Sequence, residues 1–233
     1  MPAIEWTAEE LAALAAVSSL EYQEAVVAWQ RYAPRNGRNA LAGDGGDPVS
    51  RRILDRVLTA VGQVIAGLSV GAQTKAVPLE DWQLQMADLV RFVHLAGGGA
   101  AVGGINALTV ADVNQVQEVR RFHLDKLQTL ALGLASGKIL LDGRFLRRSQ
   151  MYGDAGRGTF YDISENSFDR QGFETVRSIR SARDSCTECI DFDKREFFIG
   201  DPAYKKPGRR ICLTNCLCYE EYFNSETGER RLV

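Results

Sequence analysis

The segment VADVNQVQEVRRFHLDKLQTLALGLAS, residues Val110–Ser136, carries the clearest helical pattern in the chain. Its apolar residues recur at intervals near 3.6, as they do on one face of an amphipathic helix. Thr109 stands immediately before it and Asp112 lies three residues later, a spacing that favours a helix start because such side chains bond the free N–H groups of a first turn. We therefore predict a long helix here.

Two similar segments lie on its N-terminal side. Val49–Lys75 and Leu79–Leu95 show the same apolar spacing. Pro78 separates these two segments, and the glycine run Gly97–Gly104 separates the second from Val110, since proline and glycine both interrupt helices. We predict a helical body over residues 49–136, with the glycine run as a flexible loop between helices.

An N-terminal arm is expected before this body. In Thr7–Tyr32, Thr7 and Glu10 have the capping-box spacing, and apolar residues including Trp29 follow at helical intervals. The stretch PRNGRNALAGDGGDP, residues 34–48, is rich in turn-forming residues. We predict an amphipathic helical arm over residues 1–33 and a linker over 34–48; the arm packs either on its own body or on a partner.

The pattern changes on the C-terminal side, in residues 137–233. We expect a turn near Leu141–Arg144 and one more helix from Arg144 to Phe160. Phe173–Ile179 alternates as a strand does, and Cys218–Val233 reads as a hairpin turning at Asn224–Gly228. The predicted fold class is α+β: a mainly helical body with a small C-terminal α+β, cysteine-rich module ending in a β-hairpin.

Composition excludes several classes of protein. The 233 residues are 45% hydrophobic and 25% charged, so disorder and fibrous folds are not expected. A net charge of -2 excludes a globally polybasic nucleic-acid binder. The longest apolar stretch, Val57–Ala72, falls short of the about 18 residues that span a bilayer, and the acidic start MPAIEW is unlike a signal peptide. We predict a protein made in a reducing cytoplasm, with no membrane partner.

The five cysteines all lie beyond residue 185 and form the chemically informative cluster. They are arranged as a CxxC pair, a basic loop and a second close-spaced group. Two such groups can bring four thiolates around one Zn²⁺, which would order a module whose own core is small. The predicted ligands of this structural zinc are Cys186, Cys189, Cys216 and Cys218, with Cys212 as an alternative ligand.

Isolated thiols, or disulfides formed outside the cell, are the other interpretation of these cysteines. A redox CxxC is disfavoured because no thioredoxin-like βαβ unit precedes it. The histidines, His94 and His123, are expected to be structural or solvated, since no nucleophile motif accompanies them. Adjacent carboxylates such as Glu220 and Glu221 alternate faces on a strand, so no acid/base dyad is marked. We predict no catalytic site and no enzyme.

A family resemblance rests on motifs of the C-terminal part. GRFLRRSQMY at Gly143–Tyr152 and RGTFY at Arg157–Tyr161 are followed by the CxxC pair after Asp184 and by CLTNCLC at Cys212–Cys218. With these motifs, roughly residues 137–223 resemble the tailed-phage head morphogenesis proteins related to the Mu minor head protein. That family often has a histidine before its final Asn-Cys-x-Cys, where this chain has Leu213.

The resemblance implies a minor structural protein of the virion head, made in the host cytoplasm. Its expected partners are the portal protein, the major capsid protein or both, with contact to packaged DNA and with several copies in one assembly. It would act in head assembly or in DNA packaging and ejection through protein–protein contacts. The alternative function is a zinc-ribbon nucleic-acid-binding protein, which the basic loop Lys194–Arg210 suggests.

Overall fold

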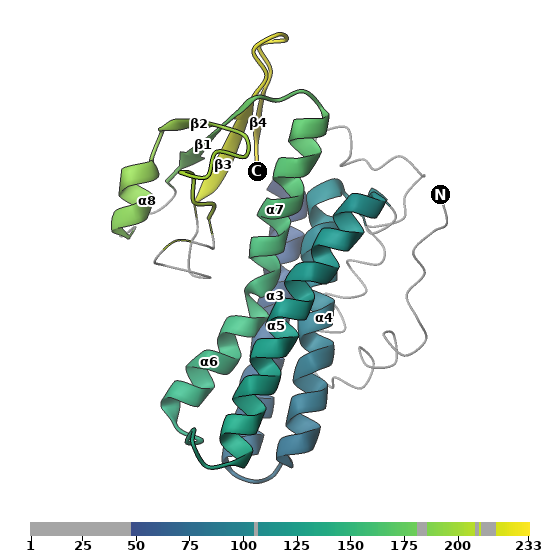
Figure 1. Cartoon of the computed structure of the whole chain (residues 1–233), viewed down its shortest axis with the longest axis vertical. Coiled ribbons are helices and arrows are strands. Elements are labelled where there is room, and N and C mark those ends of the chain that lie inside the picture. The colour runs from purple at the N-terminus through teal and green to yellow at the C-terminus, as the bar shows by residue number, and fades with distance from the viewer. Residues whose placement is uncertain (1–47, 105–106, 181–185, 208–209, 211–217) are drawn as a thin grey trace.

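A computed structural model describes residues 48–104, 107–180, 186–207, 210 and 218–233. Within these residues, five helices form an elongated body, and a small antiparallel sheet with one further short helix lies at one end of it (Figure 1). The predicted α+β class, with a helical body and a C-terminal sheet, is confirmed. The predicted arm over 1–33 and all of the linker before Pro48 lie outside the described residues.

The helical body follows most of the expected boundaries. Pro78 is the N-cap of α4, so the predicted break before Leu79 is confirmed. The helices are α3 (Pro48–Gln73), α4 (Leu79–Val102), α5 (Val110–Ala135), α6 (Gly143–Gly153) and α7 (Ala155–Arg170).

The glycine run is where the prediction of a flexible loop is wrong. Gly97, Gly98 and Gly99 are buried inside α4, which turns only at Gly103 with a left-handed φ of 78°. A Cβ on Gly97 would collide with the carbonyl oxygen of Gly156 in α7. These glycines serve close packing between two helices, and the helical hydrogen bonds of α4 continue through them.

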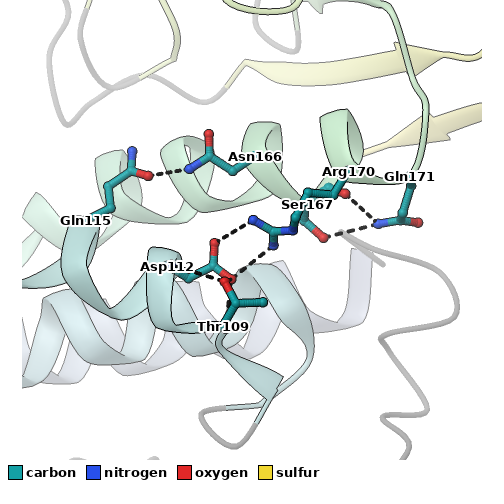
Figure 2. A network of polar contacts seen from close by, with 7 residues as sticks. All are labelled: Thr109, Asp112, Gln115, Asn166, Ser167, Arg170 and Gln171. Atoms are coloured by element: carbon teal, nitrogen blue, oxygen red, sulfur yellow. Dashed lines mark hydrogen bonds and ion pairs between the residues drawn. The ribbon is translucent and has the colours of Figure 1, made fainter.

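The start of α5 also ties it to α7. The helix start predicted at Thr109 is confirmed, and Thr109 and Asp112 form a capping box in which each side chain accepts a hydrogen bond from the other's backbone N–H. The buried Asp112 carboxylate accepts from both terminal nitrogens of Arg170, each at 3.0 Å (Figure 2). Next to this ion pair, the Asn166 side chain donates a hydrogen bond to the side-chain oxygen of Gln115. Asp112 therefore caps the start of α5 and also holds the C-terminal end of α7.

The single helix predicted from Arg144 to Phe160 is wrong, because two helices meet at Asp154. Asp142 caps α6 by accepting from the backbone N–H groups of Arg144 and Phe145 at 2.8 and 3.1 Å. A Cβ on Gly153 would lie 3.2 Å from the Cα of Gly62 in α3. The glycines around residue 154 allow α6 to lie against α3 while α7 lies against α4.

The sheet has the order β2-β1-β3-β4, with every neighbouring pair antiparallel. In the central pair, Val176 is opposite Tyr222, and the hairpin pairs Glu221 with Leu232. The predicted strand near Phe173–Ile179 and the predicted C-terminal hairpin are both confirmed. The elements are β1 (Thr175–Ile179), α8 (Thr187–Phe192), β2 (Glu196–Phe198), β3 (Tyr219–Phe223) and β4 (Arg230–Leu232).

One hydrophobic core continues from the helices into the sheet. Phe168 of α7 stacks on Tyr222 of β3 with ring centroids 4.3 Å apart, and it also meets the ring of Phe173. Arg51 of α3 donates to the backbone oxygen of Val233 at 3.2 Å. The end of the body and the sheet are therefore packed together as one unit.

One described helix segment, Leu54–Gln73 in α3, is long and apolar enough to cross a membrane by length and composition alone. The prediction that no segment reaches this length is wrong on that criterion. Val57, Val61 and Ile65 of this segment are fully buried, and α3 packs against α4 and α6. A buried core helix passes the same test of length and composition.

Candidate metal centre

Three of the predicted zinc ligands come together beside the sheet. Cys186 is the N-cap of α8, where its Sγ accepts from the backbone N–H of Cys189 at 3.4 Å. Cys218 lies immediately before β3. Cys189 and Cys218 are buried in contact with each other, and Cys186 packs against them. The α8 turn and the start of β3 therefore bring residues about thirty positions apart to one small cluster.

The remaining predicted ligand, Cys216, and its alternative, Cys212, lie outside the described residues. Within the residues that the structure describes, no group of three or more His, Cys, Asp or Glu side chains is arranged to hold a metal. The three described thiols fit Zn²⁺ in donor type, and a tetrahedral site would take its fourth sulfur from one of these two cysteines.

Arg210 connects the cysteine cluster to the rest of the module. Its side chain is buried and donates to Cys189 Sγ at 3.7 Å, to Ser178 Oγ at 2.8 Å and to the Lys205 carbonyl oxygen at 2.7 Å. Its guanidinium carbon lies 5.0 Å from the ring centroid of Phe192. Arg210 therefore ties the Cys189 sulfur to the sheet and to the loop that precedes the second cysteine group.

A buried carboxylate lies on the neighbouring strand. Glu220 is fully buried in β3 and accepts from the hydroxyl groups of Tyr204 at 2.8 Å and Tyr222 at 2.7 Å. Burial raises its pKa to about 7, although both tyrosine hydrogen bonds and the charge of Lys206 act in the opposite direction. The sequence prediction for Glu220 and Glu221 was that they alternate faces, and they do, since Glu221 forms ion pairs with Arg177 and Arg230.

Lys206 joins the loop before the second cysteine group to α7. Its Nζ lies 3.1 Å from Asp162 Oδ1 and 2.9 Å from Glu165 Oε2. Burial alone would lower the pKa of this lysine, but the two carboxylates outweigh that effect and raise it. Glu165 also accepts from the backbone N–H of Gly200 at 3.2 Å. Charged contacts therefore fix the loop on the helical body.

Sequence reasoning missed this polar network, which combines Glu220, Tyr204, Lys206 and Arg210. The available signal was a charged residue at an inward-facing position of an alternating strand, because β3 buries Glu220 and Tyr222 on the same face. A carboxylate at such a position requires partners from elsewhere in the chain. Which partners it meets depends on the tertiary fold.

The two histidines lie together away from the cysteines. His94 is fully buried in α4, and its Nδ1 lies 2.6 Å from Thr159 Oγ1 of α7. Its ring stacks on that of His123 with centroids 4.7 Å apart. Burial lowers the pKa of His94 to about 3, assisted by His123 and Arg120, so this imidazole is neutral at pH 7.

Several motif residues that carry the family resemblance form hydrogen bonds between α7 and other elements. Arg157 Nη2 bonds Asp55 of α3 at 2.9 Å. Tyr161 donates its hydroxyl to the carbonyl oxygen of Cys218 at 2.8 Å, linking α7 to the cysteine cluster. Together with the Thr159 contact to His94, these bonds connect α7 to three other parts of the molecule.

Comparison of the chain with models of protein families, with curated proteins and with solved structures found no match.

Proposed function

We propose that this chain is a structural minor head protein of a tailed bacteriophage, acting through protein–protein contacts with the portal protein, the major capsid protein or both. One observation carries the proposal: Arg157, Thr159 and Tyr161 of the RGTFY motif each form a hydrogen bond to another part of the fold. A motif that served catalysis would place polar groups toward a substrate, whereas these side chains hold elements together.

The contacts of α7 make this argument specific. Its motif residues reach α3 through Asp55, α4 through His94 and the cysteine cluster through the Cys218 carbonyl. Phe160 and Tyr161 are fully buried. A scaffold that presents a fixed shape to neighbouring subunits needs rigidity of this kind, and this supports an architectural role.

In this proposal zinc acts as a structural staple at the end of the molecule. Cys186, Cys189 and Cys218 would hold it together with Cys216, or with Cys212 in its place. The metal would fix the loop that carries these last two cysteines onto the module, since that loop is long and basic. No chemical step is assigned to it.

The zinc-ribbon nucleic-acid alternative is less well supported by the described side chains. Its basis was the charge of the loop Lys194–Arg210. Lys205 pairs with Glu188 at 2.5 Å, Lys206 pairs with two carboxylates, and Arg210 is buried. Positive charges that are already neutralised contribute little to phosphate binding.

The direct test is co-expression of the full chain with the portal and major capsid proteins of the same genome, followed by affinity purification. We expect the chain to copurify with at least one of them, and to be found in purified virion heads. As a control, a 30-base-pair DNA duplex is titrated in low and high salt. Absence from heads with no binding to either protein contradicts the proposal, and tight, salt-sensitive DNA binding would favour the alternative instead.

A further inference from the structure

A groove runs along a face of α5 that no other helix among the described residues covers. One side of α5 packs on α4, and its neighbouring side faces a cavity of about 1420 Å³. The other walls are α6, α7 and the segment 204–206. In Figure 1, α5 runs the length of the body beside α6 and α7. The α5 residues that line the groove recur from Ala111 to Leu130 at helical spacing, over about 30 Å.

The groove combines exposed apolar side chains with charged side chains of both signs. Phe122 of α5 and Met151 of α6 line it and are 57% and 44% exposed. Lysine and arginine side chains also line it, and Lys206 pairs there with Asp162. Lys205 pairs with Glu188, which leaves Lys126 and Arg148 against Glu118 and Asp154.

A segment of the same chain has the complementary composition. Residues 7–32 are expected to form an amphipathic helix whose apolar positions include Leu14, Val26 and Trp29. The segment carries four glutamates and one arginine, so it is acidic, and the groove offers it the cationic side chains of Lys126 and Arg148. A helix of this length is about 39 Å long, enough to cover the groove. The 15 residues between it and α3 can extend over about 50 Å.

We propose that the groove of α5, α6 and α7 is the docking site for the helix of residues 7–32, from the same chain or from a neighbouring copy. Apolar residues of the helix would cover Phe122 and Met151, and its glutamates would lie near Lys126 and Arg148. This is recognition of an amphipathic helix by an apolar groove, with charge setting its orientation. The inference stands independently of the proposed phage function.

The test uses the full chain with a photoreactive benzophenone amino acid in place of Phe122. After irradiation, cross-linked peptides are identified by mass spectrometry. Leu132 is the matched control, since it lies on α5, is 63% exposed and does not line the groove. We expect the Phe122 position to cross-link mainly to residues 7–32 and the Leu132 position to do so several-fold less.

Charge reversal supplies a second measurement. Lys126→Glu and Arg148→Glu should each lower the cross-linking yield about twofold to fivefold, as expected for exposed ion pairs. Arg147→Glu is the control, because Arg147 is exposed on α6 and does not line the groove. Cross-linking within a monomer supports docking in the same chain, and cross-linking in a dimer supports docking between copies. Cross-links from Phe122 to residues 48–233 of another copy, or none to residues 7–32, would overturn the proposal.

Discussion

At the scale of single residues, the most consequential side chain is one with no recognisable motif. Glu220 lies in the middle of the sheet and meets two tyrosine hydroxyl groups, with Lys206 close enough to influence its charge. Because its pKa is raised from 4.5 to about 7, the folded protein holds a proton on Glu220 that the unfolded chain releases. Folding is thus coupled to pH through this buried carboxylate, in addition to the buried His94.

The first prediction concerns this coupling. Between pH 4.5 and 7 the folded state binds more protons at Glu220 than the unfolded state, so its contribution to stability falls as pH rises. The expected loss is about 3 kcal/mol across that interval. Glu220→Gln removes this contribution, so the difference in unfolding free energy between wild type and variant should change with pH. Urea unfolding at several pH values measures it, and parallel stability curves for the two proteins would contradict it.

The second prediction concerns Arg210, which holds the loop, the sheet and the cysteine cluster together. Arg210→Lys retains the charge but cannot reach Ser178, Tyr204 and the Lys205 carbonyl at once. We expect a loss of about 2–4 kcal/mol in unfolding free energy, from several buried hydrogen bonds to a charged group. Arg195→Lys is the control, since Arg195 is exposed, and it should change stability little. Equal effects of the two substitutions would argue against a special role for Arg210.

At the scale of elements, the crossing of α4 and α7 depends on glycines. Gly97 lies against the Gly156 carbonyl, and a Cβ on Gly156 would in turn collide with the Val93 carbonyl. The two backbones can approach this closely only because neither position carries a side chain. A composition that suggests flexibility in the sequence therefore produces tight packing in the structure.

The third prediction tests this contact. Gly97→Ala should destabilise the protein by about 1–3 kcal/mol, the usual cost of overpacking, because the obstructing atom belongs to the backbone of α7. Gly67→Ala is the matched control, since Gly67 is also within a helix but has open space around its Cβ position. There alanine should stabilise by about 0.5–1 kcal/mol. Thermal or urea unfolding distinguishes the two, and a stabilised Gly97→Ala would contradict the close crossing.

At the scale of the whole molecule, the sheet module is attached to the helical body by both core packing and charge. Phe168 stacks on Tyr222, Tyr161 bonds the Cys218 carbonyl, and Lys206 pairs with α7 carboxylates. The cysteine cluster lies at this junction, where α8 and the start of β3 meet. Loss of a metal there would therefore destabilise the sheet before it destabilises the helices.

The fourth prediction is the metal content of the purified chain. Protein prepared without chelator should contain one zinc per chain, and Cys186→Ser and Cys218→Ser should each abolish it. Cys216→Ser should do the same while Cys212→Ser retains the metal; the reverse result would exchange these two ligands. Elemental mass spectrometry gives the content. Reduced wild-type protein that contains no metal would contradict the zinc proposal.

The sequence by itself determined the helices with clear periodicity and caps, the start of α5 at Thr109, the strand near Val176 and the C-terminal hairpin. These features depend on local spacing and turn chemistry, which are read from neighbouring residues. It also grouped the cysteines by spacing, and the structure brings three of them together.

Only the tertiary structure decided what the glycines and buried charges do. Gly97 belongs within a helix because α7 approaches it, and the break at Asp154 exists because α6 and α7 pack on different helices. Glu220, Lys206 and Arg210 each have at least one partner that is distant in the sequence, namely Tyr204, Asp162 and Ser178. Such contacts depend on the distance between elements in space, and no local pattern of residues encodes that distance.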